Sequence, residues 1–215
     1  MGAVIAPCIL AENSDQYQAA VARLTPFAER VHIDFCDGEF APTFTVGLEA
    51  MSWPENWQVD IHAMVARPSE YVQQLASKKP SLIVFHAEIS EDLLPVIRYL
   101  KQLGIKSGVA LQRSTVPLSV RTVIEEVDHV QIFSGNLGQH GGVASLMQLE
   151  KLRLIRAIRP SVEIGWDGGV TVENAFTLAQ GGVEVLNVGG TIAKSDEPQG
   201  VYGRLVSEIN KRGVI

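Results

Sequence analysis

Cysteine is scarce in this sequence, and its two cysteines lack the spacing of a C-x-x-C motif. Cys8 and Cys36 are the only two among 215 residues, as expected for a protein that stays reduced in the cytoplasm. Long apolar runs are absent too, because no segment approaches the roughly 20 apolar residues that cross a bilayer. The opening stretch MGAVIAPCIL lacks a basic region and a small-residue cleavage site, so a secretory signal is not expected.

An excess of basic residues is also missing. Lys and Arg number 18 against 24 Asp and Glu, a formal net charge of −6, which argues against a nucleic-acid or anionic-membrane partner. Hydrophobic residues make up 46% of the chain and charged residues 20%, the proportions of a globular protein with a sizeable core. No change of composition and no Ser/Gly-rich linker divides the sequence, so we expect one domain over residues 1–215.

Strand-like and helix-like segments alternate along the chain. The predicted strands are residues 4–10, 30–35, 58–65, 82–86, 106–111, 129–133, 162–166 and 183–188. The predicted helices are residues 15–28, 68–77, 90–103, 117–126, 146–159, 172–180 and 199–212. The stretch 37–57 is rich in Pro, Phe and Trp and is expected to form a long loop with at most a short helix.

Repeated strand–helix units in a chain of this length predict an α/β fold, a (β/α)8 TIM barrel. The alternative is an open, doubly wound sheet, which normally has a glycine-rich phosphate loop after its first strand. In this sequence the first strand is followed by AENSDQ, which contains no glycine. The barrel is therefore favoured.

Four candidate metal ligands stand at the ends of three predicted strands: His32, Asp34, His62 and Asp167. His32 and Asp34 are two residues apart, which places both on one face of a strand. A single inward His is more often a hydrogen-bonded core residue, and a single Asp before Gly-Gly is more often a turn residue. Four such residues at one end of a barrel instead favour a divalent cation, which would also neutralise the buried carboxylates.

Glycines gather in three successive loops in the last third of the chain, after the strands that end near residues 133, 167 and 188. Backbone N–H groups in such loops can approach an anion closely, and the last two loops are the usual phosphate corner of a TIM barrel. The alternative is that the glycines serve turns with positive φ, which explains one loop more readily than three. We expect a phosphate group here.

Other polar residues keep two interpretations at this stage. His86 and Glu88 could orient a ligand or a loop, and Cys8 could contact substrate or pack in the barrel. His140 could touch substrate or be a solvated loop histidine.

The combination of H-x-D-x-x-D-G at 32–38, H-x-M-V at 62–65 and D-G-G-V at 167–170, in this order, is specific. With APCIL, FHAE, GVAL and VGGTIA it resembles the ribulose-phosphate 3-epimerase family over nearly the whole chain. The resemblance implies one divalent metal ion held by His32, Asp34, His62 and Asp167. It also implies that Asp34 and Asp167 are the catalytic acid/base pair.

The chemistry agrees with these residues. Epimerising the carbon next to a ketone requires removal of a proton on one face and its return on the other, so two carboxylates supply a base and an acid. A cation stabilises the enediolate between the two steps. Mixed nitrogen and oxygen ligands suit Zn, Mn, Fe or Co, among which the sequence does not choose.

The chain departs from the family at positions expected to face substrate. The family usually has Ser at Cys8, Met at Cys36 and Phe133, and Gly-Ser at Gly189-Gly190; its N-P-G-F-G-G loop is Asn136-Leu-Gly-Gln-His-Gly-Gly here. These departures are typical of a relative that acts on another phosphosugar or only weakly on the common one. The residues expected to bind substrate or phosphate are Cys8, His62, Gly138, Gln139, His140, Gly141, Gly142, Gly168, Gly169, Gly189 and Gly190.

The function predicted from the sequence is a metal-dependent 3-epimerase of a ketose phosphate, with ribulose 5-phosphate to xylulose 5-phosphate as the first expected reaction. Two alternatives remain: an epimerase of a six-carbon ketose phosphate of the allulose 6-phosphate type, and a divergent phosphosugar-binding protein without catalysis. Barrel decarboxylases resemble the chain less, because they need a D-x-K-x-x-D cluster and the strand Asp60-Ile-His-Ala-Met has no Lys. A cytoplasmic homo-oligomer with a small-molecule phosphosugar as its partner is expected.

Overall fold

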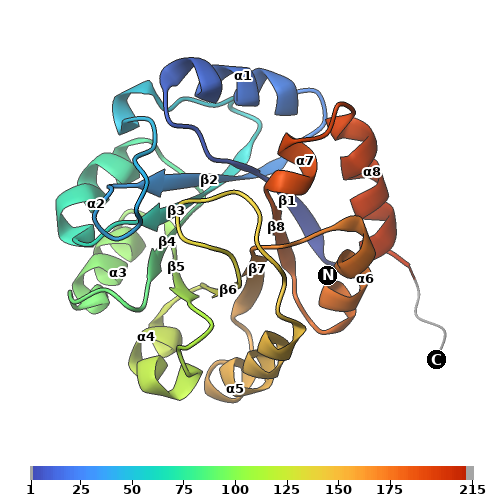
Figure 1. The fold of residues 1–215 in the computed structure, drawn as a ribbon. Helices are drawn as coiled ribbons and strands as arrows, with labels where there is room; N and C mark the ends of the chain where they lie inside the picture. Colours follow the sequence, from blue (N-terminus) through green and yellow to red (C-terminus); the bar gives the residue numbers. More distant parts are fainter. Residues whose placement is uncertain (1, 212–215) are drawn as a thin grey trace.

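Eight parallel strands close into a barrel in which each strand pairs with the next and β8 pairs with β1. This computed structural model describes residues 2–211 and confirms the predicted TIM barrel, with helices surrounding the strands (Figure 1). The strands are β1 (Val4–Ile9), β2 (Arg30–Cys36), β3 (Gln58–Met64), β4 (Leu82–His86), β5 (Lys106–Leu111), β6 (His129–Phe133), β7 (Glu163–Asp167) and β8 (Val185–Val188).

The α-helices of the described residues are α1 (Ser14–Leu24), α2 (Pro68–Ser77), α3 (Leu93–Gln102), α4 (Arg121–Glu126), α5 (Glu150–Ile158), α6 (Val172–Gln180), α7 (Gly190–Ala193) and α8 (Pro198–Ile209). Three 3-10 turns accompany them: η1 (Leu48–Ala50), η2 (Pro117–Val120) and η3 (Leu146–Leu149). None of the helices in this part of the chain is both long enough and apolar enough to cross a membrane.

The predicted helices match these elements, with differences at their ends. Helix α1 stops at Leu24 instead of residue 28, because Pro26 has no N–H to continue the helical hydrogen bonds. Helix α3 begins three residues late, where the side chain of Asp92 caps the N–H of Leu94 at 3.0 Å. The predictions for 117–126 and 146–159 each split into a 3-10 turn and a short α-helix. Helix α8 ends before position 212, which lies outside the described residues.

Side chains alternate along each strand between the outside of the barrel, which faces the helices, and the barrel interior. Val31, Ile33 and Phe35 of β2 point outward and join the apolar core between the barrel and its helices. The residues between them, His32 and Asp34, point into the barrel. One face of each strand therefore builds the core, and the other is free to carry polar chemistry.

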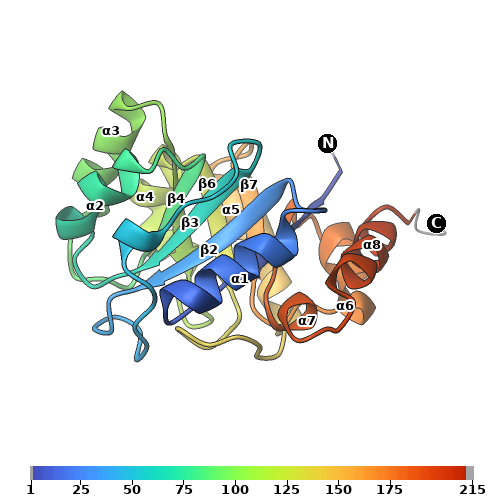
Figure 2. The ribbon, with the colours of Figure 1, turned by 90° about the horizontal axis from the view of Figure 1, so that it is seen from above.

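The register between neighbouring strands decides which inward side chains lie at the same level along the barrel axis. Asp34 of β2 lies opposite His62 of β3, and Asp167 of β7 lies opposite Asn187 of β8. The loop after β2, the loop after β6 and helix α7 all lie at the same end of the barrel (Figure 2). The stretch 37–57 is a long loop with one 3-10 turn, as predicted.

Candidate active site and metal centre

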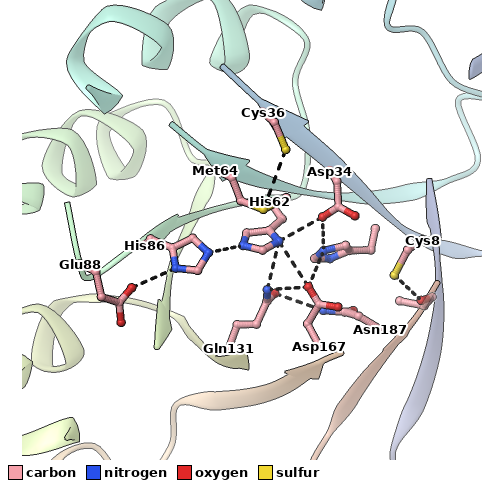
Figure 3. A network of polar contacts seen from close by, with 12 residues as sticks. Cys8, Asp34, Cys36, His62, Met64, His86, Glu88, Gln131, Asp167 and Asn187 are labelled. Carbon is pink, nitrogen blue, oxygen red and sulfur yellow. Dashed lines mark hydrogen bonds and ion pairs between the residues drawn. The ribbon is translucent and has the colours of Figure 1, made fainter. Parts of the chain in front are cut away.

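The four predicted metal ligands meet inside the barrel mouth. The Nδ1 atom of His62 lies 3.1 Å from Asp34 Oδ1 and 3.3 Å from Asp167 Oδ2. The Nε2 atom of His32 lies 3.3 and 3.5 Å from the same two oxygens. All four atoms lie within 4.8 Å of one another. The close view shows Asp34 and Asp167 approaching His62 from two sides (Figure 3).

This arrangement fits a divalent cation. Ligand atoms about 2.1 Å from a tetrahedral ion are about 3.4 Å apart, close to the 3.1 to 3.5 Å between these imidazole nitrogens and carboxylate oxygens. The Nε2 atom of His32 is buried and has no hydrogen-bond partner among residues 2–211. Imidazole nitrogens and carboxylate oxygens together are the ligands that a divalent transition-metal ion prefers. The unpartnered nitrogen of His32 is therefore free to bind such an ion.

The imidazoles of the cluster hold protons more tightly than usual, because two carboxylates face them. Burial alone would lower the pKa of His32, but the carboxylates of Asp167 and Asp34 outweigh it and raise that pKa to about 10. Burial would likewise raise the pKa of Asp34 and Asp167, yet the two imidazoles lower both. A cation bound here would take the place of these protons, so its affinity should fall as the pH falls.

A chain of hydrogen bonds orients His62. Burial lowers the pKa of His86 to about 4, so its ring is neutral and has one donor and one acceptor nitrogen. His86 Nδ1 lies 3.0 Å from Glu88 Oε2 and donates to it, which leaves Nε2 to accept from His62 Nε2 at 2.9 Å. When His62 is neutral, the lone pair of its Nδ1 therefore faces the cluster, where a cation can bind in place of a proton. His86 and Glu88 therefore touch or support a predicted ligand, and Glu88 also accepts from the N–H of Gln112 at 2.8 Å.

Two buried amides at the cluster were missed by sequence reasoning. Gln131 of β6 donates from Nε2 to Asp167 Oδ2 at 3.1 Å, and Asn187 of β8 donates from Nδ2 to Gln131 Oε1 at 3.1 Å. The available signal was a polar residue at the centre of each apolar strand, in HVQIF and VLNV. Such residues face the barrel interior by the same alternation that reveals His32 and Asp34.

A cavity of about 310 Å³ opens above the cluster. The predicted site residues that line it are Cys8, Asp34, Gly138, Gln139, His140, Gly141, Gly142, Asp167, Gly168, Gly169, Gly189 and Gly190. His32 and His62 are buried and do not line this cavity. The structure thus brings the two carboxylates and all three glycine loops to one hollow.

The glycines of this hollow have different reasons to be glycine. Gly168 and Gly169 have φ of 103° and 71°, and a Cβ on either would lie within 2.2 Å of neighbouring backbone, so chain packing alone requires them. Gly190 lacks a positive φ, and the nearest atom to a Cβ there is the Gly141 nitrogen at 3.7 Å. The chain itself does not require glycine at position 190, and the space beside Gly190 is part of the cavity.

Comparison with known proteins identifies the family. The sequence model of the Ribulose-phosphate 3 epimerase family matches residues 4–193. Ribulose-phosphate 3-epimerase of Helicobacter pylori is 34% identical over 177 residues, which cover 79% of this chain and 82% of that protein. The Escherichia coli protein of the same name is 30% identical over 221 residues, covering 97% and 96%. The chain belongs to this family. It is an epimerase, an enzyme of the isomerase class.

Solved structures support the fold. The chain is similar to 3-keto-L-gulonate-6-phosphate decarboxylase of Vibrio cholerae, with a TM-score of 0.75 and 12% identity over 98% of both chains. It is also similar to 3-hexulose-6-phosphate synthase of Salmonella typhimurium, with a TM-score of 0.72 and 16% identity over 97% and 98% of the two chains. At these identities the similarity shows a shared barrel and nothing about the reaction.

The residues that depart from the family pattern lie around the cluster. Phe133 packs against His62 and His86, with ring centroids 5.6 and 5.3 Å apart, and Cys36 Sγ lies 3.9 Å from Met64 Sδ. Cys8 both lines the cavity and is packed in the barrel. Burial, reinforced by Asp167 and Asp34, raises the pKa of the Cys8 thiol well above its usual value, so the thiol stays protonated.

Lys194 was also missed from the sequence. It follows helix α7 and lines the cavity beside the glycine loops, with its Cε 3.8 Å from the position of a Cβ on Gly190. It is the only Lys or Arg lining this cavity in the described part of the chain. A single exposed lysine after a short helix has no periodic sequence signal that would single it out.

Proposed function

We propose that this epimerase interconverts ribulose 5-phosphate and xylulose 5-phosphate. The observation that carries the proposal is the pair of carboxylates, Asp34 on β2 and Asp167 on β7, which meet at one cluster beneath a cavity lined by glycine loops. The curated relatives are named ribulose-phosphate 3-epimerases, which makes the five-carbon sugar the first substrate to test.

Asp34 and Asp167 are the proposed catalytic residues. One carboxylate removes the proton from carbon 3 of the sugar, and the other returns a proton to the opposite face. In the reverse direction their roles exchange. The two side chains come from strands separated by β8 and β1, so they reach the substrate from different directions, which inversion requires.

His32, Asp34, His62 and Asp167 would hold one divalent cation, for which Zn, Mn, Fe and Co are the candidates. When bound, such a cation supplies Lewis-acid stabilisation of the negative charge that develops on the enediolate oxygens. The apolar side chains of Met64 and Phe133 exclude water from this end of the cavity.

The phosphate end of the substrate is proposed to lie among Gly138, Gly141 and Gly190, where backbone N–H groups can reach an anion. The space beside Gly190 and the ammonium of Lys194 support this placement. Gln139, His140, Gly142, Gly189 and Cys8 are proposed to shape the hollow around the sugar.

The wider setting is proposed to be a single-domain protein in the cytoplasm that forms a homo-oligomer. Two free, buried cysteines are consistent with a reducing compartment. The exposed apolar side chains of Val143 and Met147 would be available to a second copy of the chain. Light scattering on the purified protein would measure its oligomeric state.

Substitution of the two aspartates tests the proposed mechanism. Asp34→Asn and Asp167→Asn keep the side-chain shape and remove the base, so epimerisation of ribulose 5-phosphate should fall by roughly a hundredfold or more. Metal content is measured beside each rate, because both residues are proposed ligands. Full activity in both variants, with the metal retained, would show that the two-aspartate mechanism is wrong.

A further inference from the structure

Gln131 and Asn187 place two amides in the barrel interior, and the buried Oδ1 atom of Asn187 has no hydrogen-bond partner among the described residues, which is unfavourable. Gln131 is fully buried and Asn187 is 2% exposed. They come from β6 and β8, the two strands that flank β7, which carries Asp167. None of the steps proposed above uses them. In Figure 3 the Gln131 amide lies beside Asp167 and His62, and its Nε2 is 3.3 Å from His62 Nδ1.

The contacts allow only one orientation of the two amides. An ionised carboxylate offers acceptors alone, so Gln131 must present Nε2 to Asp167 Oδ2. Its Oε1 then faces Asn187, which must present Nδ2. Asp167 therefore fixes Gln131, and Gln131 fixes Asn187. By the same contacts, Asn187 keeps Gln131 in the orientation that donates to Asp167.

The two oxygens of Asp167 consequently differ. Oδ2 lies 3.3 Å from His62 Nδ1 and 3.5 Å from His32 Nε2, and it accepts from Gln131. Oδ1 receives no hydrogen bond from any side chain of residues 2–211, and Asp167 lines the cavity. A donor on Oδ2 restrains rotation of the carboxylate, so the two oxygens keep different surroundings.

We propose that Gln131 and Asn187 form a positioning pair that holds Asp167 Oδ2 in the cluster and leaves Oδ1 for proton transfer. The proposal rests on the proposed function of Asp167 as one of the two proton-transfer groups. Asn187 acts only through Gln131. Replacing Asn187 by Asp removes the donor, so Gln131 turns to donate to the new carboxylate and presents its carbonyl oxygen to Asp167, which repels it.

Inversion and proton exchange together test this pair. In heavy water, Asn187→Asp and Gln131→Met should lower inversion on the order of 10- to 100-fold, the usual cost of losing an outer hydrogen-bond partner. Asp34 removes the carbon-3 proton from one of the two epimers. The rate at which that epimer exchanges its proton should stay within about threefold of the rate in the unsubstituted protein. Bound metal should stay near one equivalent. Asn210→Asp, at the exposed end of α8, is the matched control with unchanged rates.

The double variant separates positioning from an added charge. If Asn187 acts through Gln131, Asn187→Asp alone should lower the inversion rate roughly tenfold or more. In the Gln131→Met background the same substitution should lower that rate less than about threefold. Equal costs in both backgrounds would overturn the proposal. The proposal would also be overturned if inversion and proton exchange fell in parallel for both epimers. It would equally be overturned if the single substitutions lowered the inversion rate less than about twofold.

An NMR measurement on the metal-free protein tests the orientation without any activity. The side-chain NH₂ signals of Gln131 and Asn187, assigned by their disappearance in Gln131→Met and Asn187→Asp, should exchange slowly with solvent. In Asn187→Asp the Gln131 signals should shift as the amide turns. Unshifted Gln131 signals would overturn the positioning pair. If the signals behave as expected but no ketose phosphate is turned over, the proposed function fails while the hydrogen-bonded pair stands.

Discussion

Lys194 supplies positive charge to a cavity that otherwise contains two carboxylates. Lys194→Met should raise KM for ribulose 5-phosphate roughly five- to tenfold with little change in kcat, about 1 kcal/mol for a partly screened charge interaction. Inorganic phosphate should also inhibit the variant less strongly. Lys101→Met, on the exposed surface of α3, is the control. Unchanged KM and unchanged phosphate inhibition would remove Lys194 from the phosphate site.

Gly190 tests whether the hollow takes an anion. A Cβ at this position meets no atom closer than 3.7 Å, so Gly190→Val should fold and raise KM at least tenfold by occupying ligand space. Gly189 is a poorer probe, because a Cβ there would lie 2.7 Å from His140 Nδ1. Gly203→Val on α8 has nothing within 4 Å and serves as the control. A stable Gly190→Val with normal KM would contradict this phosphate position.

The residues of the cluster could be predicted because their spacing carries the information. His32 and Asp34 alternate with apolar residues, so period-two logic placed both inside the barrel. Gln131 and Asn187 obey the same logic but stand alone among apolar neighbours, where a single amide resembles ordinary packing. The tautomer of His62 could not be predicted at all, because it depends on His86 and Glu88, which sequence alone does not place against it.

Strands were easier to locate than helix ends. Strand β6 was predicted at its observed bounds, and β7 was displaced by one residue, since β-branched residues and alternation mark strands directly. Helix α7 was missed, because four residues are too few for a helical period to show. Element ends depend on caps such as Asp92 and on tertiary contacts, which a single sequence reveals only in part.

A charged network ties the strand beginnings at the opposite end of the barrel. Arg30 of β2 donates to Asp60 at 2.6 Å and to both oxygens of Glu163 at 2.9 and 2.8 Å, and His129 Nδ1 lies 2.7 Å from Glu163 Oε2. Burial would raise the pKa of Glu163, but Arg30 and His129 lower it far below its usual value. Because the pKa of Glu163 is lower in the folded protein, its ionised carboxylate stabilises the fold at pH values above the unfolded-state pKa of about 4.3. This stabilisation is lost as the pH falls toward the folded-state pKa.

Glu163→Gln should therefore lower the urea midpoint of unfolding at pH 7 and matter progressively less below about pH 4. The measurement is the difference in midpoint between the unsubstituted protein and the variant at pH 7, 4 and 3. Glu125→Gln, whose carboxylate pairs with Arg121 on the surface of α4, is the control and should change little. A difference that grows in acid would contradict the assigned direction.

At the scale of the whole molecule, the repeated strand–helix units made the barrel predictable from the sequence. The identity of the substrate could not be predicted in this way. The cavity is lined by the loops after β6, β7 and β8 and by side chains near the ends of β1, β2 and β3. Its shape depends on how Phe133, His140 and Lys194, which are distant in the sequence, pack around it, and no local sequence pattern encodes that packing.

Metal binding should stabilise the barrel as a whole, because the cluster joins β2, β3 and β7. A cation at about 100 times its Kd contributes about 2.7 kcal/mol, so Tm should rise roughly 5–10 °C over chelator-treated protein. The shift should shrink at low pH, where protons compete for the imidazoles. His62→Ala should abolish it. An equal rise in His62→Ala would mean that the stabilising ion binds elsewhere.

Proton NMR in heavy water tests the central claim most directly. Metal-loaded protein is incubated with ribulose 5-phosphate, and the carbon-3 proton of the sugar is followed. We predict that this signal disappears as deuterium enters and that xylulose 5-phosphate accumulates with deuterium at carbon 3. Turnover of a six-carbon ketose phosphate alone would contradict the assigned substrate. Bound sugar and bound metal, with no proton exchange for any ketose phosphate, would contradict catalysis itself.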